Sequence, residues 1–186
     1  MLKAKNGFEL VKLIKDLNYA LLGHAEREEV ALMIGTSSVE SHNVHREQLS
    51  GGPARGLFGV EPDTCLDIYS TYLSRTVKRS LYLRMMDMVF NLRSCPFFIP
   101  SREDVTRLLR EWDDYSFCIS RLKYLRIPYA IPKTHTLRAS YYKQWYNTEA
   151  GSGSPEKYLE AWNECNCHEL MKSVGFSVND PLRELR

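Results

Sequence analysis

The sequence predicts a mainly α-helical fold, because three of its features agree. Apolar residues recur at helical spacing along most of the 186 residues. Typical helix-starting residues precede several of these segments, and outside residues 56–61 no stretch alternates between apolar and polar side chains as a strand would. At 44% hydrophobic residues the chain is long enough to bury its own core, so we expect one domain over residues 1–186.

Helical segments make up most of the first half of the chain. Glu26, Glu28 and Glu29 suit the positive end of a helix dipole, and Pro62 is typical of a first helical turn. Residues 41–53 are polar, contain a Gly pair and lack an apolar period, which predicts an exposed loop, and residues 54–60 can form a short strand or turn. We expect helices over residues 7–22, 26–39, 62–73 and 76–92.

Prolines and a capping pattern divide the second half of the chain. Ser101 with Asp104 is close to a capping box, which predicts a helix start. Residues 127–132 contain two prolines and cannot be helical across both, so we expect a rigid extended connection there. The Gly-Ser-Gly-Ser stretch at 151–154 predicts a turn before Pro155. We expect the remaining helices over residues 102–112, 114–126, 136–147 and 155–171.

Charge and cysteine content exclude several classes of protein. The 25 basic and 23 acidic residues leave a formal net charge of only +2, which argues against nucleic acid as a partner. The five cysteines are odd in number and scattered, so we expect reduced thiols rather than a disulfide framework. Charged residues interrupt the N-terminal segment at short intervals, so we expect neither a signal peptide nor a membrane span, and a protein made soluble in a cytoplasm.

Glu40 is the candidate for chemistry because of its place in the predicted helices. It follows the apolar body of the helix over residues 26–39, at the end where the helix dipole disfavours a carboxylate. A carboxyl held there against apolar surface gains proton affinity and can serve as a general acid near neutral pH. The alternative is an ordinary surface glutamate at a helix end.

A dense group of glycines follows Glu40. Gly51, Gly52, Gly56 and Gly59 fall within nine residues, which is unusual in a helical domain unless the backbone must pass close to something. A polymer lying in a groove is one such neighbour. This pattern favours a substrate groove beside the predicted turn.

Residues 40–64, ESHNVHREQLSGGPARGLFGVEPDT, resemble the first signature of the lytic transglycosylase and goose-type lysozyme superfamily. In that signature Glu-Ser is followed further along by Gly-Leu-Met-Gln and then by Pro and Thr. The segment is especially similar to phage-encoded variants that carry Gly-Gly-Pro-Ala before the turn. The resemblance implies a lysozyme-like helical domain with a small β-hairpin or turn beside the substrate groove.

The resemblance also implies roles for individual residues. Glu40 takes the role of catalytic acid, and Ser41 that of the neighbouring hydroxyl. The glutamine of the family signature is Gly59 here, and the family's second signature, Ala-Tyr-Asn followed by Gly, is echoed only loosely by residues 145–147 and Gly151. The aromatic residues between 129 and 146 are dense, which is typical of a core, but sugar rings also stack on such residues and a tyrosine hydroxyl near Glu40 would orient the acid. For that role Tyr146 is the first choice, because it falls at this second motif. The substrate-binding residues implied in this way are Ser41, Gly56, Leu57, Phe58, Tyr146 and Asn147, with Pro62 and Thr64 at the start of the next helix.

The implied activity is cleavage of the β-1,4 bond between N-acetylmuramic acid and N-acetylglucosamine in peptidoglycan, without a cofactor. In the transglycosylase route Glu40 acts alone, first as acid and then as base. In an inverting hydrolase a second carboxylate about 6.5 to 9.5 Å away must activate water. Glu47, Glu61 and Asp63 are the candidates for that role, with Glu61 preferred because it adjoins the predicted turn. We favour the transglycosylase route.

The sequence also offers a non-catalytic function, a metal site and a cysteine nucleophile as alternatives. An inactive lysozyme-like structural or interaction protein of a phage virion, with other virion proteins as partners, is the main alternative, and Gly59 favours it. His42 with His45, and Cys165 with Cys167 and His168, do not form a four-ligand zinc set, so we expect no metal. A cysteine nucleophile lacks a helix N-terminus to activate it. We expect the protein in a phage virion, or in the host cytoplasm before release, and acting in the periplasm or cell wall.

Overall fold

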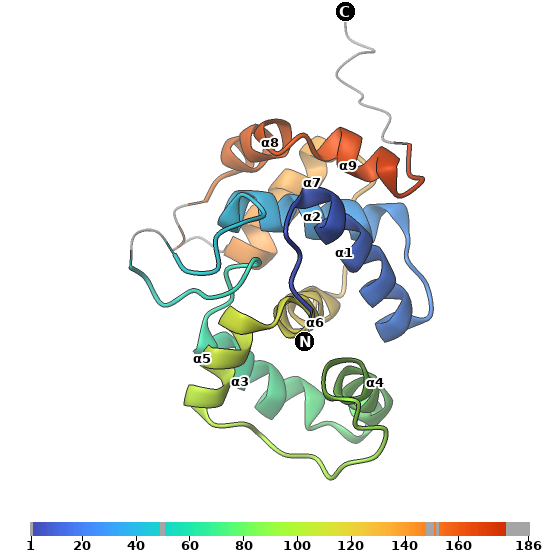
Figure 1. Cartoon of the computed structure of the whole chain (residues 1–186), viewed down its shortest axis with the longest axis vertical. Helices are drawn as coiled ribbons and strands as arrows, with labels where there is room; N and C mark the ends of the chain where they lie inside the picture. The colour runs from blue at the N-terminus through green and yellow to red at the C-terminus, as the bar shows by residue number, and fades with distance from the viewer. Residues whose placement is uncertain (1, 49–50, 148–150, 152, 178–186) are drawn as a thin grey trace, which may run out of the picture.

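Nine α-helices account for most of the chain in the computed structural model, which describes residues 2–48, 51–147, 151 and 153–177 (Figure 1). The predicted mainly helical fold is therefore confirmed. Residues 49–50 of the predicted loop and Ser152 of the predicted turn lie outside the described residues. The helices are α1 (Gly7–Leu22), α2 (Arg27–Ser41), α3 (Pro62–Asp67), α4 (Arg79–Phe90), α5 (Arg102–Glu111), α6 (Asp113–Leu125), α7 (His135–Tyr142), α8 (Pro155–Glu164) and α9 (Cys167–Ser173).

The helices form two groups with α6 between them (Figure 1). The upper group in the view contains α1, α2, α7, α8 and α9, and the lower group contains α3, α4 and α5. Helix α6 packs against α1 from the upper group and against α4 and α5 from the lower. The segment between α2 and α3 runs down one side of the molecule and connects the groups, so residues that follow α2 lie where both groups meet.

Helix α2 is the buried centre of the upper group. Every residue from Glu29 to Ser38 is buried, and the hydroxyls of Thr36 and Ser38 donate to carbonyls one turn earlier, so their polarity is satisfied inside the core. Gly35 permits close packing of α8, because a Cβ at this position would lie 2.0 Å from the hydroxyl oxygen of Tyr158. The end of α2 is thereby held in a fixed place.

Two buried ion pairs tie the segments around α2 together. Arg121 of α6 donates to Glu29 of α2 at 2.5 Å and to Asn18 of α1 at 3.0 Å. Arg46, in the loop after α2, donates to both oxygens of Asp113 at 2.9 and 2.7 Å. Partnered charges of this kind are strongly destabilised when one member is removed. They fix the loop that leads from α2 toward the lower group.

Several helices differ in detail from the prediction. The last predicted helix is two helices, because Asn166 adopts a left-handed conformation with φ of 52° and redirects the chain before α9. The predicted helix over 62–73 continues from α3 into a π-helical turn, Ile68–Leu73, and the one over 136–147 ends in another, Lys143–Asn147. A short 3-10 turn, Thr76–Lys78, precedes α4.

The predicted small hairpin is not confirmed. Within the described residues, Arg55 makes only isolated antiparallel bridges, to Glu47 and to Val60, and no named strand forms. The backbones of Arg55 and Val60 exchange two hydrogen bonds, at 2.9 and 3.0 Å, around residues 56–59, so of the predicted hairpin or turn the segment forms a turn closed by one bridge. Among the described helices none is long and apolar enough to cross a membrane.

Candidate active site

The carboxyl group of Glu40 lies in the last turn of α2 and is held by α7. The hydroxyl of Tyr142 donates to its Oε1 at 2.7 Å. Burial raises the pKa of Glu40 to about 7, and the Tyr142 hydrogen bond and the positive charge of Lys123 partly oppose this increase. A carboxyl with this pKa exists in both protonation states near neutral pH, which suits a group that donates and accepts protons.

Gly59 lies directly against this carboxyl. A Cβ on Gly59 would be 2.3 Å from Oε2 of Glu40 and 2.9 Å from its Cδ, and the φ of Gly59 is +58°, where side chains are disfavoured. Glu40 and the turn at 56–60 are therefore in direct contact at Gly59. Gly59 differs from the glutamine of the family signature, and in this structure a side chain there would displace Glu40.

Two buried hydroxyl groups hold the backbone of the turn beside Glu40 in place. Ser41 Oγ donates to the carbonyl of Leu57 at 2.8 Å, and the hydroxyl of Tyr146 donates to the carbonyl of Phe58 at 2.7 Å. The side chains of Leu57 and Phe58 are fully buried in the core. Gly56, with φ of +74°, packs against the backbone of Leu109.

These positions correct the expectation that the turn residues line the groove. Ser41, Gly56, Leu57 and Phe58 are buried. The apolar side chains of Leu57 and Phe58 gain more by joining the core than by facing a polar pocket, and Ser41 is buried with them through its hydrogen bond to the Leu57 carbonyl. These residues belong to the core that lies beneath the pocket. The residues that do line the pocket beside Glu40, which has a volume of about 290 Å³, are Glu40, Gln48, Ala54, Gly59, Glu61, Thr64, Lys123, Tyr146, Asn147 and Gly151.

The candidate second carboxylates occupy different places. Glu61 lines the pocket with Glu40. Asp63 does not line it: it lies on the exposed surface, where Arg102 donates to its Oδ1 at 2.9 Å and holds the pKa of its carboxyl below the usual range. Glu47 lines a different hollow. Only Glu61 of these three is in the same pocket as Glu40.

The prediction that the Tyr146 hydroxyl orients Glu40 is wrong, because a different tyrosine donates to the carboxyl. Tyr142, one helical turn earlier, donates to Glu40, whereas the Tyr146 hydroxyl lies on the Phe58 carbonyl and 2.9 Å from Ser120 Oγ. Tyr142 is the last residue of α7, whereas Tyr146 lies in the π-helical turn that follows. Tyr146 and its neighbour Asn147 still line the pocket.

Asn147 braces the edge of the pocket. Its Oδ1 accepts hydrogen bonds from Lys143 Nζ at 3.1 Å and from the backbone N–H of Gly153 at 3.1 Å. Lys143 also donates to the carbonyl of Gly151 at 2.9 Å. The loosely matching second motif therefore lies at the pocket, with Asn147 holding the chain beyond α7 against it.

Lys123 is a pocket residue that the sequence did not single out. It lies near the end of α6, where its Nζ donates to the carbonyl of Tyr146 at 2.7 Å and is 4.0 Å from the centroid of the Tyr146 ring. Burial lowers the pKa of Lys123, and the charges of Glu40 and Glu61 oppose that decrease. No motif marks this lysine, because it shares a pocket with Glu40 only once α6 has packed against α2, through hydrogen bonds such as that between Tyr124 and Thr36.

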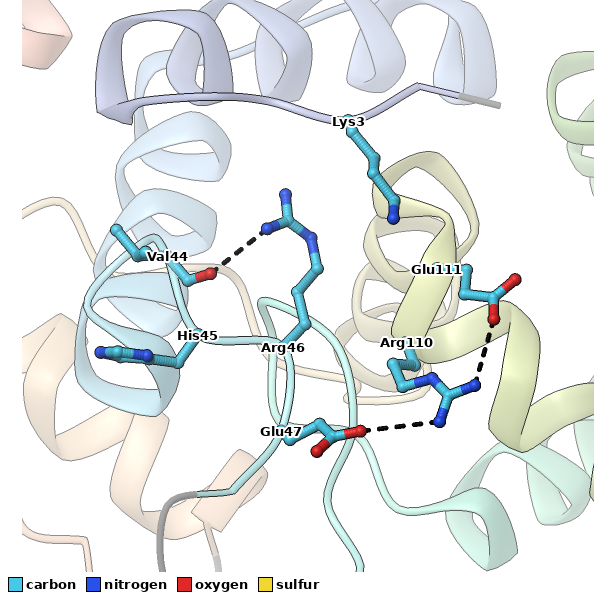
Figure 2. Close-up of a pocket in the computed structure, with 7 residues that line it drawn as sticks. All are labelled: Lys3, Val44, His45, Arg46, Glu47, Arg110 and Glu111. Atoms are coloured by element: carbon cyan, nitrogen blue, oxygen red, sulfur yellow. Dashed lines mark hydrogen bonds and ion pairs between the residues drawn. The ribbon is translucent and has the colours of Figure 1, made fainter.

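A second hollow, of about 480 Å³, lies between the loop after α2 and the end of α5 (Figure 2). Most of its charged side chains form ion pairs, and Lys3 also lines it. Arg110 lies 3.6 Å from Glu47 and 3.1 Å from Glu111, and Arg46 donates to the backbone of Val44 (Figure 2). Arg46 also donates to Asp113. Paired charges of this kind do not require a ligand, so the hollow at Glu40 is the stronger candidate for chemistry.

The histidines and cysteines considered as metal ligands do not form a metal site within the described residues. Within the described residues, no group of three or more His, Cys, Asp or Glu side chains is arranged to hold a metal ion. His42 lies 3.3 Å from Glu164, and Cys167 forms a hydrogen bond with Ser38 at 3.1 Å. Burial raises the pKa of Cys167 to about 12, so this thiol is not an activated nucleophile.

No protein-family model matches this chain, and no solved structure matches it. The functional interpretation therefore depends on the geometry around Glu40 and on the resemblance of residues 40–64 to the lytic transglycosylase signature.

Proposed function

We propose that this chain cleaves the glycan strand of peptidoglycan between N-acetylmuramic acid and N-acetylglucosamine, with Glu40 as general acid and base. The observation that carries the proposal is the environment of Glu40, a carboxyl with a pKa of about 7 at the edge of a polar pocket. Glycosidases protonate the leaving oxygen with a carboxyl whose pKa has been raised in this way. The resemblance of residues 40–64 to the lytic transglycosylase signature supports the same assignment.

The proposed reaction needs one carboxyl that works twice. Protonated Glu40 donates its proton to the glycosidic oxygen, and the bond between that oxygen and C1 of the muramic residue breaks through an oxocarbenium-like transition state. The resulting Glu40 carboxylate accepts the proton of the C6 hydroxyl, whose oxygen bonds to C1 and closes a 1,6-anhydro ring. No water is consumed. The Tyr142 hydroxyl holds Oε1 in place through both steps.

A hydrolytic route would require a second carboxylate that activates water. Glu61 is the candidate, because it lines the same pocket, whereas Asp63 is engaged with Arg102 outside it. We propose the transglycosylase route, and the products distinguish the two. Muramic ends formed by transglycosylation are lighter than reducing ends by one water.

The test uses purified cell walls and the full chain. Wild-type protein should clear them and release 1,6-anhydro ends, and Glu40→Gln should abolish clearing because an amide keeps the shape but cannot donate the proton. Glu61→Gln is the matched control, because it removes the other pocket carboxyl and should slow the reaction only modestly. Reducing ends together with an inactive Glu61→Gln would establish a hydrolase. Wild-type protein that clears no wall preparation would support the inactive virion protein instead.

A further inference from the structure

The pocket at Glu40 contains an unusual combination of charges. Of its described lining residues, Lys123 is the one with a positive charge, and it shares the pocket with the carboxyls of Glu40 and Glu61. A half-buried ammonium costs free energy unless opposite charges or hydrogen-bond acceptors compensate it. Its presence in a small pocket therefore calls for an explanation.

The contacts of Lys123 fix its ammonium group in the pocket. One N–H donates to the Tyr146 carbonyl at 2.7 Å, and the group lies 4.0 Å from the centroid of the Tyr146 ring. An ammonium has three N–H donors, so two remain for other acceptors. The backbone of the π-helical turn thus positions a cation whose other two donors form no hydrogen bond within the part of the chain that the structure describes.

Of the described charged and titratable groups around Glu40, Lys123 is the one that can place a positive charge in the pocket. Tyr142 and Tyr146, from the α7 side, are neutral because burial raises the pKa of both phenols. Glu61, from the segment before α3, has the same sign as ionised Glu40. Arg126, the residue directly after α6, forms an ion pair with Asp67 at 2.6 Å on the surface.

We infer that Lys123 is a positioning residue of the proposed reaction: its ammonium stabilises the Glu40 carboxylate after the proton has left, so that the same group can act as base. The inference depends on the role of Glu40 proposed above and adds a residue from a different helix. The effect of Lys123 on the pKa of Glu40 opposes that of burial, and the effect of Glu40 on the pKa of Lys123 does the same. The two groups are therefore electrostatically coupled in both directions.

A structural role is the competing explanation, since Lys123 also braces the Tyr146 carbonyl. Lys123→Gln separates the two roles, because the amide supplies an N–H donor for that carbonyl and carries no charge. Lys123→Arg retains the charge. Arg126→Gln is the matched control, because it removes one positive charge from the same end of α6 but outside the pocket.

The measurement is the titration of the Glu40 side-chain carboxyl by carbon-13 NMR, assigned by its loss in Glu40→Gln. From a wild-type midpoint of about 7, Lys123→Gln should raise the midpoint, as expected for loss of an opposite charge in the same pocket. Lys123→Arg and Arg126→Gln should leave it near the wild-type value. On cell walls, the alkaline limit of activity should move upward with the midpoint in Lys123→Gln, and kcat should fall more than KM changes.

An unchanged Glu40 midpoint in folded Lys123→Gln would overturn the inference and leave Lys123 a structural brace. If that variant does not fold, the same coupling is measured from the other side: the pKa of Lys123 should fall in Glu40→Gln, and an unchanged value would overturn the inference. Wild-type protein that titrates as expected but cleaves no cell wall would refute the proposed function, while the coupling of Glu40 with Lys123 would stand.

Discussion

Replacing Glu40 by glutamine should stabilise the protein at alkaline pH while it abolishes the proposed activity. Burial raises the pKa of this carboxyl from its usual 4.5 to about 7, so ionised Glu40 is disfavoured in the folded state. At about 1.4 kcal/mol per pH unit, this difference corresponds to about 3 kcal/mol. Glutamine keeps an oxygen for the Tyr142 hydroxyl and carries no charge to bury.

The sign of the pH dependence follows from the direction of the shift. Below pH 4.5 the carboxyl is protonated in the folded and unfolded states, so wild type and Glu40→Gln should have similar free energies of unfolding. As the pH rises toward about 7, the unfolded chain releases the proton and the folded chain keeps it, so the wild type loses stability relative to the variant. Above that pH both states are ionised, and the difference should level off near its maximum.

Urea unfolding at pH 4, 6 and 9 measures this difference. The control is Glu160→Gln, which removes an exposed carboxylate of α8 and should follow the wild type at every pH. Wild type and Glu40→Gln that remain equally stable from pH 4 to pH 9 would refute the argument, because they would show that folding does not desolvate Glu40. Such a result would also remove the physical basis for its role as a general acid.

Three further substitutions probe the same site. Gly59→Ala should lower the free energy of unfolding by about 1 to 2 kcal/mol in urea titrations. It should also reduce wall clearing, because a Cβ would lie 2.3 Å from Glu40 Oε2 at a φ of +58°. Unchanged clearing would show that the Glu40 carboxyl can move without loss of activity. Tyr142→Phe removes the donor to Glu40 and should raise the alkaline limit of activity with little change in melting temperature; an unmoved pH profile would contradict this. Tyr146→Phe should instead cost about 1 to 3 kcal/mol of stability by leaving the buried Phe58 carbonyl unpaired, and stability equal to wild type would count against that contact.

Local sequence signals determined most of the helices. The apolar period predicted α1 over its observed residues, 7–22, and the proline at the first helical position predicted the starts of α3 and α8. Ser101 caps α5 as expected, accepting a hydrogen bond from the backbone N–H of Asp104 at 3.1 Å. These features could be predicted because they depend on residues within one or two turns of each other.

The division of the last helix was not predictable in the same way. Residues 155–171 carry a continuous helical pattern, yet Asn166 adopts a left-handed conformation that starts a new direction. Asparagine tolerates this conformation but does not impose it. Packing of α9 against α1 and α2 selects it, and that packing involves residues far away in the sequence.

The features of the candidate site also divide into those set by local sequence and those set by tertiary packing. The sequence determined where Glu40 stands, at the end of an apolar helix and before a glycine-rich turn, because both features are local. The tertiary structure alone decided that Tyr142 rather than Tyr146 donates to Glu40, and that Lys123 shares its pocket. These contacts join α2 to α6 and α7, which follow it by some 80 to 100 positions. The pKa of a carboxyl depends on such neighbours and on burial, so the chemistry of Glu40 emerges only when the three helices pack together.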